Sequence, residues 1–308
     1  MNKKLNILFI GYISEPFDYF DLDDKLLIDS MRNFRDDNIS IVHWKDIKDD
    51  LSSNKVFDLN SNNYKNYDLN LFDVIPIIEL PDDNSPNMDK ERVFDLISLM
   101  NINNLPTINP TNVFLNNPDK SYLWTNKNIP LPKTFKVDSN SNIESILKQL
   151  GEEIIIKPTD GDGGRGVEKV INNLNYVKEI ISEKGPMIVQ EFVKDIYKGE
   201  RSLFFFDKDL KYAILKKPKK NEFRSNEKHC QNISKYIPNE NEIRIAKEAL
   251  NNFNSGSLIE RVDLAGEKII ELTVDCPGLY VNYANVEKEI GPWFYELINK
   301  TLESRNQP

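Results

Sequence analysis

A glycine-rich turn between two strand-forming runs places the strongest constraint on how this chain folds. The segment IIIKPTDGDGGRGVEKV (154–170) has a β-branched run before the glycines and a second strand-like run after them. Gly161, Gly163 and Gly166 match G-x-G-x-x-G in form, but a dinucleotide fold needs that pattern where a strand turns into a helix. The Gly-Lys-Ser/Thr of a P-loop does not follow either. The segment therefore predicts two strands joined by a flap.

Such a flap is suited to cover phosphate groups, because glycines let backbone N–H groups approach an anion with no side chain in the way. Lys157 ends the first strand and supplies a point charge for the same phosphates. The alternative is an exposed hairpin turn with an incidental lysine, which the loop alone does not exclude.

The two halves of the chain show different patterns of apolar residues. Strand-like runs alternate with helical runs up to about residue 115, which predicts a small α/β unit with a parallel sheet. The Asn-, Asp- and Ser-rich stretch 49–70 has little apolar periodicity and is predicted to be a surface loop. In the second half, strand-like runs lie close together, with helices predicted at 143–150, 173–183 and 239–252. That pattern indicates an α+β unit with antiparallel sheets.

Composition excludes several classes of protein. The chain has 308 residues and a net charge of −9, which disfavours a general binder of nucleic acid or anionic membranes. Two Cys and two His exclude a disulfide scaffold and a zinc site with several Cys or His ligands, and they fit a cytoplasmic compartment. No apolar run approaches the about 18 residues that span a bilayer, and we interpret the N-terminal run as a buried strand rather than a signal peptide.

A buried strand that ends in an acid is the second signal. In MIVQEFV (187–193), Glu191 is a candidate acceptor for an adenine amino group, and the backbone of Phe192 and Val193 is a candidate to read the adenine edge. Glu200 follows as a candidate acceptor for a ribose hydroxyl. The alternative is that Glu191 only faces solvent at the strand end.

A hairpin with three oxygen-bearing side chains is the third signal. In IERVDLAGEKIIELTVDCP (259–277), alternation puts Glu271 and Thr273 on one face, with Asp263 opposite them on the partner strand. Such oxygens suit magnesium, which takes one or two carboxylates together with nucleotide phosphates. Asp275 is a spare candidate on the same face. The alternative is a polar hairpin face exposed to solvent.

Taken in order, these features resemble the ATP-grasp superfamily, most closely the bacterial glutathione synthetase-like ligases and the branch that includes D-cycloserine synthetase. The resemblance covers about residues 116–281, and the following residues carry it: Lys120, Lys157-Pro158, Gly163-Gly164, Gln190-Glu191-Phe192-Val193, Asp263 and Glu271. It implies an ATP-grasp fold that combines α/β and α+β parts. An N-terminal Rossmann-like domain is expected at 1–115, a central lid subdomain at 116–193, and a C-terminal subdomain with an antiparallel sheet at 194–308.

The resemblance also implies roles for residues around the nucleotide. Lys120 and Lys157 resemble the two lysines that hold the ATP phosphates, and Gly163 and Gly164 resemble the loop over the γ-phosphate. The adenine hinge of the family corresponds here to Gln190, Glu191, Phe192 and Val193. The same resemblance puts Glu200 near the ribose.

Metal and catalytic positions follow from the same resemblance. Asp263 and Glu271 resemble the magnesium carboxylates, while Thr273 stands where the family usually has Asn or Glu. Lys216 and Arg224 resemble positions near the phosphates and the acyl intermediate, and Arg261 is a further catalytic candidate. The neighbouring lysines at 217, 219 and 220 are interpreted as a solvated basic loop.

The implied activity is ligation of a carboxylate to an amine through an acylphosphate, with ATP and a pair of Mg²⁺ ions, or Mn²⁺, as cofactors. The implied partners are small carboxylate and amine substrates and a second copy of the chain, with no nucleic acid and no membrane. Two other functions stay open. One is a ligase that adds amino acids to a peptide or protein terminus. The other is a non-catalytic nucleotide-binding paralogue, suggested by Thr273.

Three departures argue against a plain glutathione synthetase. IIELPDDN stands where those enzymes have an Arg-Lys-Asp-Pro-Pro-like segment, and EKHCQN (227–232) stands in place of a glycine-rich stretch. Ser202 replaces an arginine, with Arg201 one place early, and a one-residue shift changes the face of a strand. These departures favour a paralogue with its own acid and amine. A covalent role for Cys230 is not expected, because ligation needs no protein nucleophile.

Overall fold

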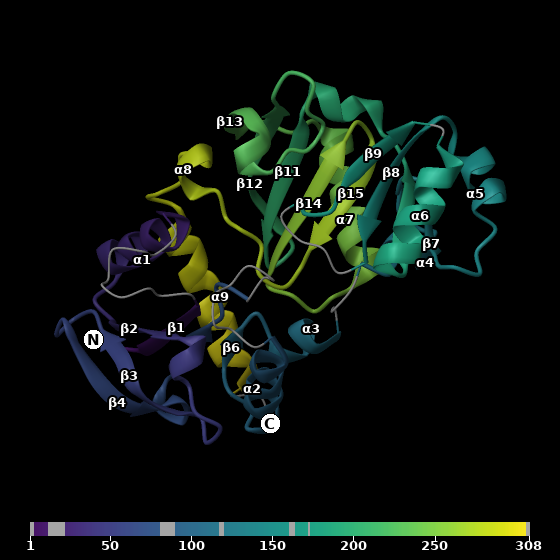
Figure 1. Cartoon of the computed structure of the whole chain (residues 1–308). Coiled ribbons are helices and arrows are strands. Elements are labelled where there is room, and N and C mark those ends of the chain that lie inside the picture. The colour runs from purple at the N-terminus through teal and green to yellow at the C-terminus, as the bar shows by residue number, and fades with distance from the viewer. Residues whose placement is uncertain are drawn as a thin grey trace.

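The computed structural model describes residues 3–11, 22–80, 90–116, 120–159, 164–171 and 173–305. Figure 1 shows two lobes, a lower one built around the N-terminal strands and an upper one that holds two further sheets. The C-terminal helix α9 (Ile290–Arg305) returns to the lower lobe and packs on α1 (Leu22–Phe34). Gly291 permits this close approach, since a Cβ there would lie 2.6 Å from the backbone of Ser30.

The lower lobe contains a four-stranded sheet in the order β1-β2-β3-β4. Its strands are β1 (Asn6–Gly11), β2 (Asn38–His43), β3 (Ser52–Asp58) and β4 (Asn63–Asp68). The short strands β5 (Ile75–Pro76) and β6 (Thr107–Ile108) pair in parallel, and isolated bridges connect β1 to the β5 segment. Helix α2 (Lys90–Ile102) buries one apolar face here, and α3 (Thr111–Asn116) follows β6.

One expectation for this lobe is wrong: the stretch 49–70 is not a surface loop but contains the β3–β4 hairpin. The predicted strands do pair in parallel, β1 with β2 and with the β5 segment, and β5 with β6. The hairpin adds two antiparallel strands at the edge of β2, so the whole sheet is mixed. Leu51, Val56 and Phe57 bury their side chains, whereas the side chains of β4 are mostly exposed. The exposed strand shows no apolar alternation, so its stabilising contribution is backbone pairing, which composition does not reveal.

The upper lobe begins with a four-stranded antiparallel sheet in the order β7-β10-β8-β9. Its strands are β7 (Thr134–Val137), β8 (Glu153–Pro158), β9 (Glu168–Ile171) and β10 (Met187–Glu191). Helices α5 (Ile143–Leu150) and α6 (Leu174–Lys184) share one hydrophobic cluster with it. Asn142 and Asn173 cap these helices by accepting hydrogen bonds from backbone N–H groups of their first turns.

A five-stranded antiparallel sheet follows, in the order β13-β12-β11-β14-β15. Its strands are β11 (Glu200–Phe206), β12 (Asp209–Pro218), β13 (Cys230–Tyr236), β14 (Ile259–Ala265) and β15 (Lys268–Thr273). Phe204 and Phe206 point to the core shared with α9, while Phe205 points to the core under α7 (Glu240–Phe253). The Phe-Phe-Phe run therefore reflects a strand that is covered on both faces.

The remaining elements are short. Two are single-turn helices, α4 (Tyr122–Thr125) and α8 (Val281–Ala284). Four are 3₁₀ turns, at Trp44–Asp46, Leu69–Leu71, Lys194–Lys198 and Glu227–His229. None of the described helices is both long and apolar enough to cross a membrane.

A buried amide connects the two lobes. Asn109 Oδ1 accepts hydrogen bonds from the backbone N–H groups of Leu258 and Ile259, both at 2.8 Å. Its Nδ2 donates to the carbonyl oxygens of Val274 (3.1 Å) and Asp275 (2.8 Å). The chain after β6 is thereby joined to the start of β14 and to the segment after β15, which holds the β14–β15 hairpin against the lower lobe.

Replacing this amide is expected to destabilise the protein strongly. Asn109→Ala removes the acceptor of the Leu258 N–H and leaves the buried Ile259 N–H only its 3.3 Å bond to Ser257 Oγ, so we expect the free energy of unfolding to fall by about 2–4 kcal/mol. Urea unfolding measures the loss. The matched control is Asn103→Ala, because Asn103 is exposed and makes one bond to Leu99 O; it should cost below about 1 kcal/mol. Equal losses in the two variants would contradict the role given to Asn109.

Candidate functional site

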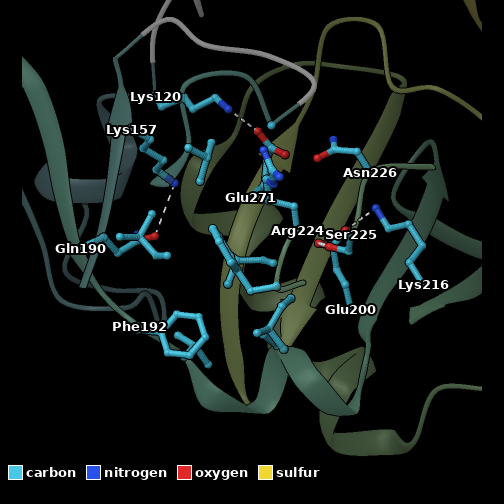
Figure 2. A pocket seen from close by; sticks show the side chains of 18 of the residues that line it. Lys120, Lys157, Gln190, Phe192, Glu200, Lys216, Arg224, Ser225, Asn226 and Glu271 are labelled. Atoms are coloured by element: carbon cyan, nitrogen blue, oxygen red, sulfur yellow. Dashed lines mark hydrogen bonds and ion pairs between the residues drawn. The ribbon is translucent and has the colours of Figure 1, made fainter. Parts of the chain in front are cut away.

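A cavity lies between the two upper sheets, and most of the predicted site residues line it (Figure 2). The lining includes twelve of them: Lys120, Lys157, Gly164, Gln190, Glu191, Phe192, Val193, Glu200, Lys216, Arg224, Arg261 and Glu271. Asp263 and Thr273 lie next to this lining on β14 and β15. Gly163 lies outside the described residues.

Two lysines enter the cavity from one side (Figure 2). Lys120 Nζ donates to Glu271 Oε1 at 2.5 Å. Lys157, on β8, donates to Gln190 Oε1 at 3.4 Å, and Gln190 in turn donates to Thr134 Oγ1 at 2.7 Å. Burial, assisted by the charge of Lys120, lowers the pKa of Lys157 to about 8. The charged form of Lys157 is thus destabilised by its surroundings, and an anionic ligand nearby would stabilise it.

The β14–β15 hairpin brings the predicted metal residues together. Its register pairs Asp263 with Glu271 and Arg261 with Thr273. The Arg261 guanidinium donates to Asp263 Oδ2 at 3.0 Å and to Thr273 Oγ1 at 3.1 Å. Burial alone would raise the pKa of Glu271, but Lys120 and Arg261 hold it at about 2. The Glu271 carboxylate is therefore ionised, as a metal ligand must be.

The donor set of this hairpin fits magnesium. Asp263, Glu271 and Thr273 offer hard oxygen atoms, and magnesium takes only one or two carboxylates when phosphates supply further oxygens. Over the described ranges, no group of three or more His, Cys, Asp or Glu side chains is arranged to hold a metal ion. Asp275 is placed differently from the expectation: β15 ends at Thr273, and Asp275 Oδ1 accepts from Cys276 N at 2.8 Å. Strand alternation therefore does not extend to it.

A buried ion pair forms the opposite wall (Figure 2). Lys216 is 3% exposed, and its Nζ contacts Glu200 Oε1 and lies 3.8 Å from Asp263 Oδ1. Ser225 Oγ donates to the other oxygen of Glu200. Burial would lower the pKa of Lys216, but the Asp263 and Glu200 carboxylates raise it above its ordinary value. Both oxygens of Glu200 thus hold the wall of the cavity, and its contact with a ribose stays a prediction.

The exchange of arginine and serine in β11 has a structural consequence. Ser202 Oγ donates to Asp263 Oδ1 at 2.5 Å, on the cavity side of the sheet. Arg201 points to the other side, where its Nε lies 3.0 Å from Glu242 of α7. The one-residue shift therefore moves the guanidinium out of the cavity, as strand alternation requires.

A single carboxylate organises the loop 219–229, which closes one end of the cavity. Glu222 Oε1 accepts from the backbone N–H groups of Phe223 (2.9 Å) and Arg224 (3.0 Å) and from Arg224 Nε (3.1 Å). Glu222 Oε2 accepts from Arg224 Nη2 (2.8 Å), and His229 Nδ1 lies 3.0 Å from it. These bonds, those from Arg224 foremost, lower the pKa of Glu222 to about 2. Sequence reasoning did not identify Glu222, because its partners are its own neighbours in a loop.

The glycine loop touches this same loop. Gly164 has φ +72°, and a Cβ there would lie 2.2 Å from Asn226 Oδ1, so only glycine fits. Cys230 Sγ donates to Ser225 O at 3.2 Å, and burial raises the pKa of its thiol to about 11. Cys230 is thus a packed thiol with no thiolate at neutral pH, in agreement with the absence of a covalent role.

Aromatic side chains line the end of the cavity near Phe192. Lys169 Nζ lies 4.2 Å from the centroid of the Phe192 ring, and Phe192 meets Phe223 edge-on with centroids 6.0 Å apart. Glu191 forms an ion pair with Lys268 of β15, so its carboxylate connects the two upper sheets. Lys268 is a second contact that sequence reasoning missed.

Comparison with known proteins identifies the family of this chain. A family model described as "Prokaryotic glutathione synthetase, ATP-grasp domain" matches residues 122–288, more than half of the chain. The chain belongs to this ATP-grasp family. Glutathione synthetase from Mesorhizobium japonicum is 26% identical over 168 residues, and that from Agrobacterium fabrum is 28% identical over 145. The matches cover 53% of both chains in the first case, and 43% of this chain and 45% of the relative in the second. The chain thus spans about half the length of these relatives.

Solved structures share the ATP-grasp fold over nearly the whole chain. D-cycloserine synthetase DcsG superposes with a TM-score of 0.68 at 18% identity, covering 95% of this chain and all of that one. The ATP-grasp ligase PsnB, complexed with minimal precursor, gives 0.64 at 15%, covering 97% and 100%. D-alanine–D-alanine ligase from Bacillus anthracis gives 0.62 at 14%, covering 98% and 100%. The mixed α/β and antiparallel architecture predicted from the sequence is therefore confirmed.

The buried pair in the ATP-grasp cavity predicts a specific pattern of stability. Lys216→Met leaves the Glu200 carboxylate buried without its cation, so we expect a loss of about 3–5 kcal/mol in the free energy of unfolding. Adding Glu200→Gln should restore part of this loss, because no unpaired charge remains. Urea unfolding checks both.

The matched control is Lys217→Met, since Lys217 is the exposed neighbour of Lys216 on the same strand; it should change stability by about 0.5 kcal/mol or less. A double variant less stable than Lys216→Met would show that the pair does not act as a unit.

Proposed function

We propose that this chain is an ATP- and Mg²⁺-dependent, ADP-forming ligase that joins a carboxylate to an amine. The single observation that carries the proposal is the convergence of Lys120 and Lys157 with the Asp263–Glu271 pair around one cavity. Cations for phosphates and carboxylates for a metal thereby lie within one space between two sheets. Membership of the ATP-grasp family supports the same assignment.

In this proposal Lys120 and Lys157 bind the phosphates of ATP, and the Gly164 loop covers them. The adenine lies toward Phe192 and Val193. Asp263 and Glu271 would hold Mg²⁺, as a pair of ions or with Mn²⁺ in its place, with Thr273 as a weaker ligand; the metal would neutralise phosphate charge. The chain is divided as 1–115, 116–193 and 194–308, so that the last two units enclose the nucleotide.

The proposed chemistry has two steps. A carboxylate oxygen of the acid substrate attacks the γ-phosphorus of ATP, the bond to the β,γ-bridging oxygen breaks, and ADP and an acylphosphate form. The amine then attacks the acyl carbon, inorganic phosphate leaves, and the amine loses a proton as the amide forms. Arg261, Lys216 and Arg224 are proposed to neutralise the charge of the transferring group, since positioning and electrostatics dominate phosphoryl transfer.

The substrate class is small amino-acid-like molecules or peptides. The structural neighbours include a D-cycloserine synthetase, a D-alanine–D-alanine ligase and a ligase complexed with a precursor, so the fold itself does not choose between them. The segment EKHCQN (227–232), which begins within the clamped loop, stands where glutathione synthetases carry a glycine-rich stretch. This difference favours an acid and an amine other than those of glutathione.

The test is release of ADP with ATP, magnesium and a panel of acid and amine pairs that includes γ-glutamylcysteine with glycine, D-amino acids and peptides, followed by product mass. We expect a product that equals the two substrates less one water, formed together with ADP. Lys157→Ala should lower turnover at least about 100-fold while the fold is kept, whereas the exposed Lys178→Ala should not change it. ATP binding without ADP release for any pair would favour the non-catalytic paralogue.

Nucleotide binding should be coupled to proton uptake. The pKa of Lys157 is lowered to about 8 in the free protein, and nearby phosphates favour its charged form, so binding raises that pKa. At pH 8 we expect uptake of about half a proton, and affinity for ATP should fall as the pH rises from about 7 to about 9.

Titration calorimetry in buffers of different ionisation enthalpy measures this uptake. Lys157→Arg is the matched control, because arginine stays charged and should show no such uptake. The same uptake in that variant would assign the proton to another group.

A further inference from the structure

The segment around the clamped loop carries a charge opposite to that of the whole chain. Residues 217–235 contain six Lys or Arg and two Glu, a net charge of +4, in a chain of net charge −9. The remaining residues therefore carry −13. Such a local reversal of charge raises the local concentration of anions in a protein that otherwise repels them.

Five exposed lysines form this segment's surface, and we call them the lysine strip: Lys217, Lys219, Lys220, Lys228 and Lys235. Both acids of the segment are engaged elsewhere. Glu222 holds Arg224, and Glu227 accepts a hydrogen bond from Tyr283 Oη. Among the described residues, no carboxylate lies within ion-pair distance of any lysine of the strip. Many other surface lysines do have such a partner, as Lys148 has in Glu144.

The strip is held in a defined shape. Lys219 Nζ donates to the carbonyl oxygen of Lys228 at 2.7 Å, and the backbone N–H of Lys219 donates to His229 O at 2.9 Å. Together with the Glu222 clamp, these bonds close the loop at its base. A preorganised loop loses little conformational freedom when it binds a ligand.

One lysine of the strip, Lys235, lies on the edge strand β13, and the others lie on the end of β12 and on the loop that leads from it to the cavity. β13 stands at the margin of the five-stranded sheet, next to β12 (Figure 1). Lys217 is paired with Asn232, and Lys235 with Ile214, so alternation puts these two lysines on opposite faces of the edge. At the other end, the loop residues from Phe223 to Asn226 line the cavity itself. A ligand on this edge would therefore extend into the site.

We propose that the lysine strip binds an acidic peptide in an extended conformation alongside β13, and that this peptide is a substrate of the proposed ligase. An edge strand offers backbone N–H and C=O groups to an extended chain, and the lysines on both faces match acidic side chains. The proposal rests on the proposed function for its use in catalysis, but the binding itself requires no turnover.

Peptide fits this surface better than the other polyanions. Single-stranded RNA is bound through aromatic stacking and arginine, but Arg224 is held by Glu222 and Phe223 packs edge-on against Phe192, so neither is presented by the strip. Anionic membranes are bound by basic residues together with several exposed apolar anchors. The exposed side chains of β13 are the polar Gln231, Asn232 and Lys235, and Ile237 is a single exposed apolar residue beside them. Lysines on an edge strand also prevent pairing between sheets, so the test must separate binding from this protective role.

The test is fluorescence anisotropy with a labelled peptide of alternating Glu and Ala, about ten residues long, and its counterpart of alternating Gln and Ala. We expect the Glu peptide to bind at least about tenfold more tightly than the Gln peptide, with an affinity that falls as salt is added. Replacing all five lysines of the strip by Gln should weaken binding of the Glu peptide at least about tenfold.

The matched control removes the same charge from exposed lysines elsewhere: Lys25→Gln, Lys127→Gln, Lys178→Gln, Lys247→Gln and Lys288→Gln. It should bind the Glu peptide within about twofold of the unmodified protein. Equal weakening in both variants would overturn the proposal, because overall charge would then explain the binding. So would equal affinity for the two peptides, absence of binding, or tighter binding of poly(U) RNA through the same lysines.

ATP binding and ADP release with small substrates are measured on the same variants. Neither involves the strip, so both should be unchanged. If the unmodified protein releases no ADP, that result counts against the proposed ligase and does not affect the peptide-binding result. Failure of peptide binding with ADP release retained would count against the strip alone.

Discussion

The pairing of Asp263 with Glu271 across the β14–β15 hairpin is the constraint on which the rest of the site depends. Two carboxylates placed opposite one another repel, and like charges directly across a strand pair destabilise a sheet. They are tolerated because the guanidinium of Arg261, on β14, bonds Asp263 and Thr273, and because Lys120, which precedes α4, donates to Glu271. In the protein without ligand, the cations around the cavity therefore offset the repulsion between these two carboxylates. A ligand that brings its own metal and phosphates would exchange partners with them rather than enter an empty space.

This arrangement explains why the cavity needs both sheets. The hairpin supplies the carboxylates, while Lys157 belongs to the sheet on the other side of the cavity. Two connections keep these parts in register: Asn109 joins the hairpin to the lower lobe, and Glu191 joins the two upper sheets through Lys268. Asn109 also supplies partners to backbone groups at strand ends, whereas Glu191 and Lys268 connect the sheets through their side chains.

Two loops meet beside the cavity, the loop 219–229 and the glycine loop that contains Gly164. Glu222 collects several donors in the loop 219–229, which gives Arg224 a defined position beside the cavity. The facing glycine loop has no side chain at Gly164 and approaches Asn226 closely. The clamp at Glu222 and the contact between Gly164 and Asn226 therefore fix where these two loops meet at the cavity.

Local pattern alone determined much of this protein. Alternation and glycine spacing predicted the flap after Lys157, and alternation on the β14–β15 hairpin predicted that Asp263 would face Glu271, since both depend on neighbours in the chain. The hairpin within 49–70 and the edge strand β13 were not predicted, because their side chains are mostly polar and their stability comes from backbone pairing. Only the tertiary structure decided that Lys268 would reach Glu191, and that Asn109 would join β14 to the lower lobe. Those contacts join residues that are far apart in the sequence. The periodicity of a single segment does not show which distant segment it will pack against.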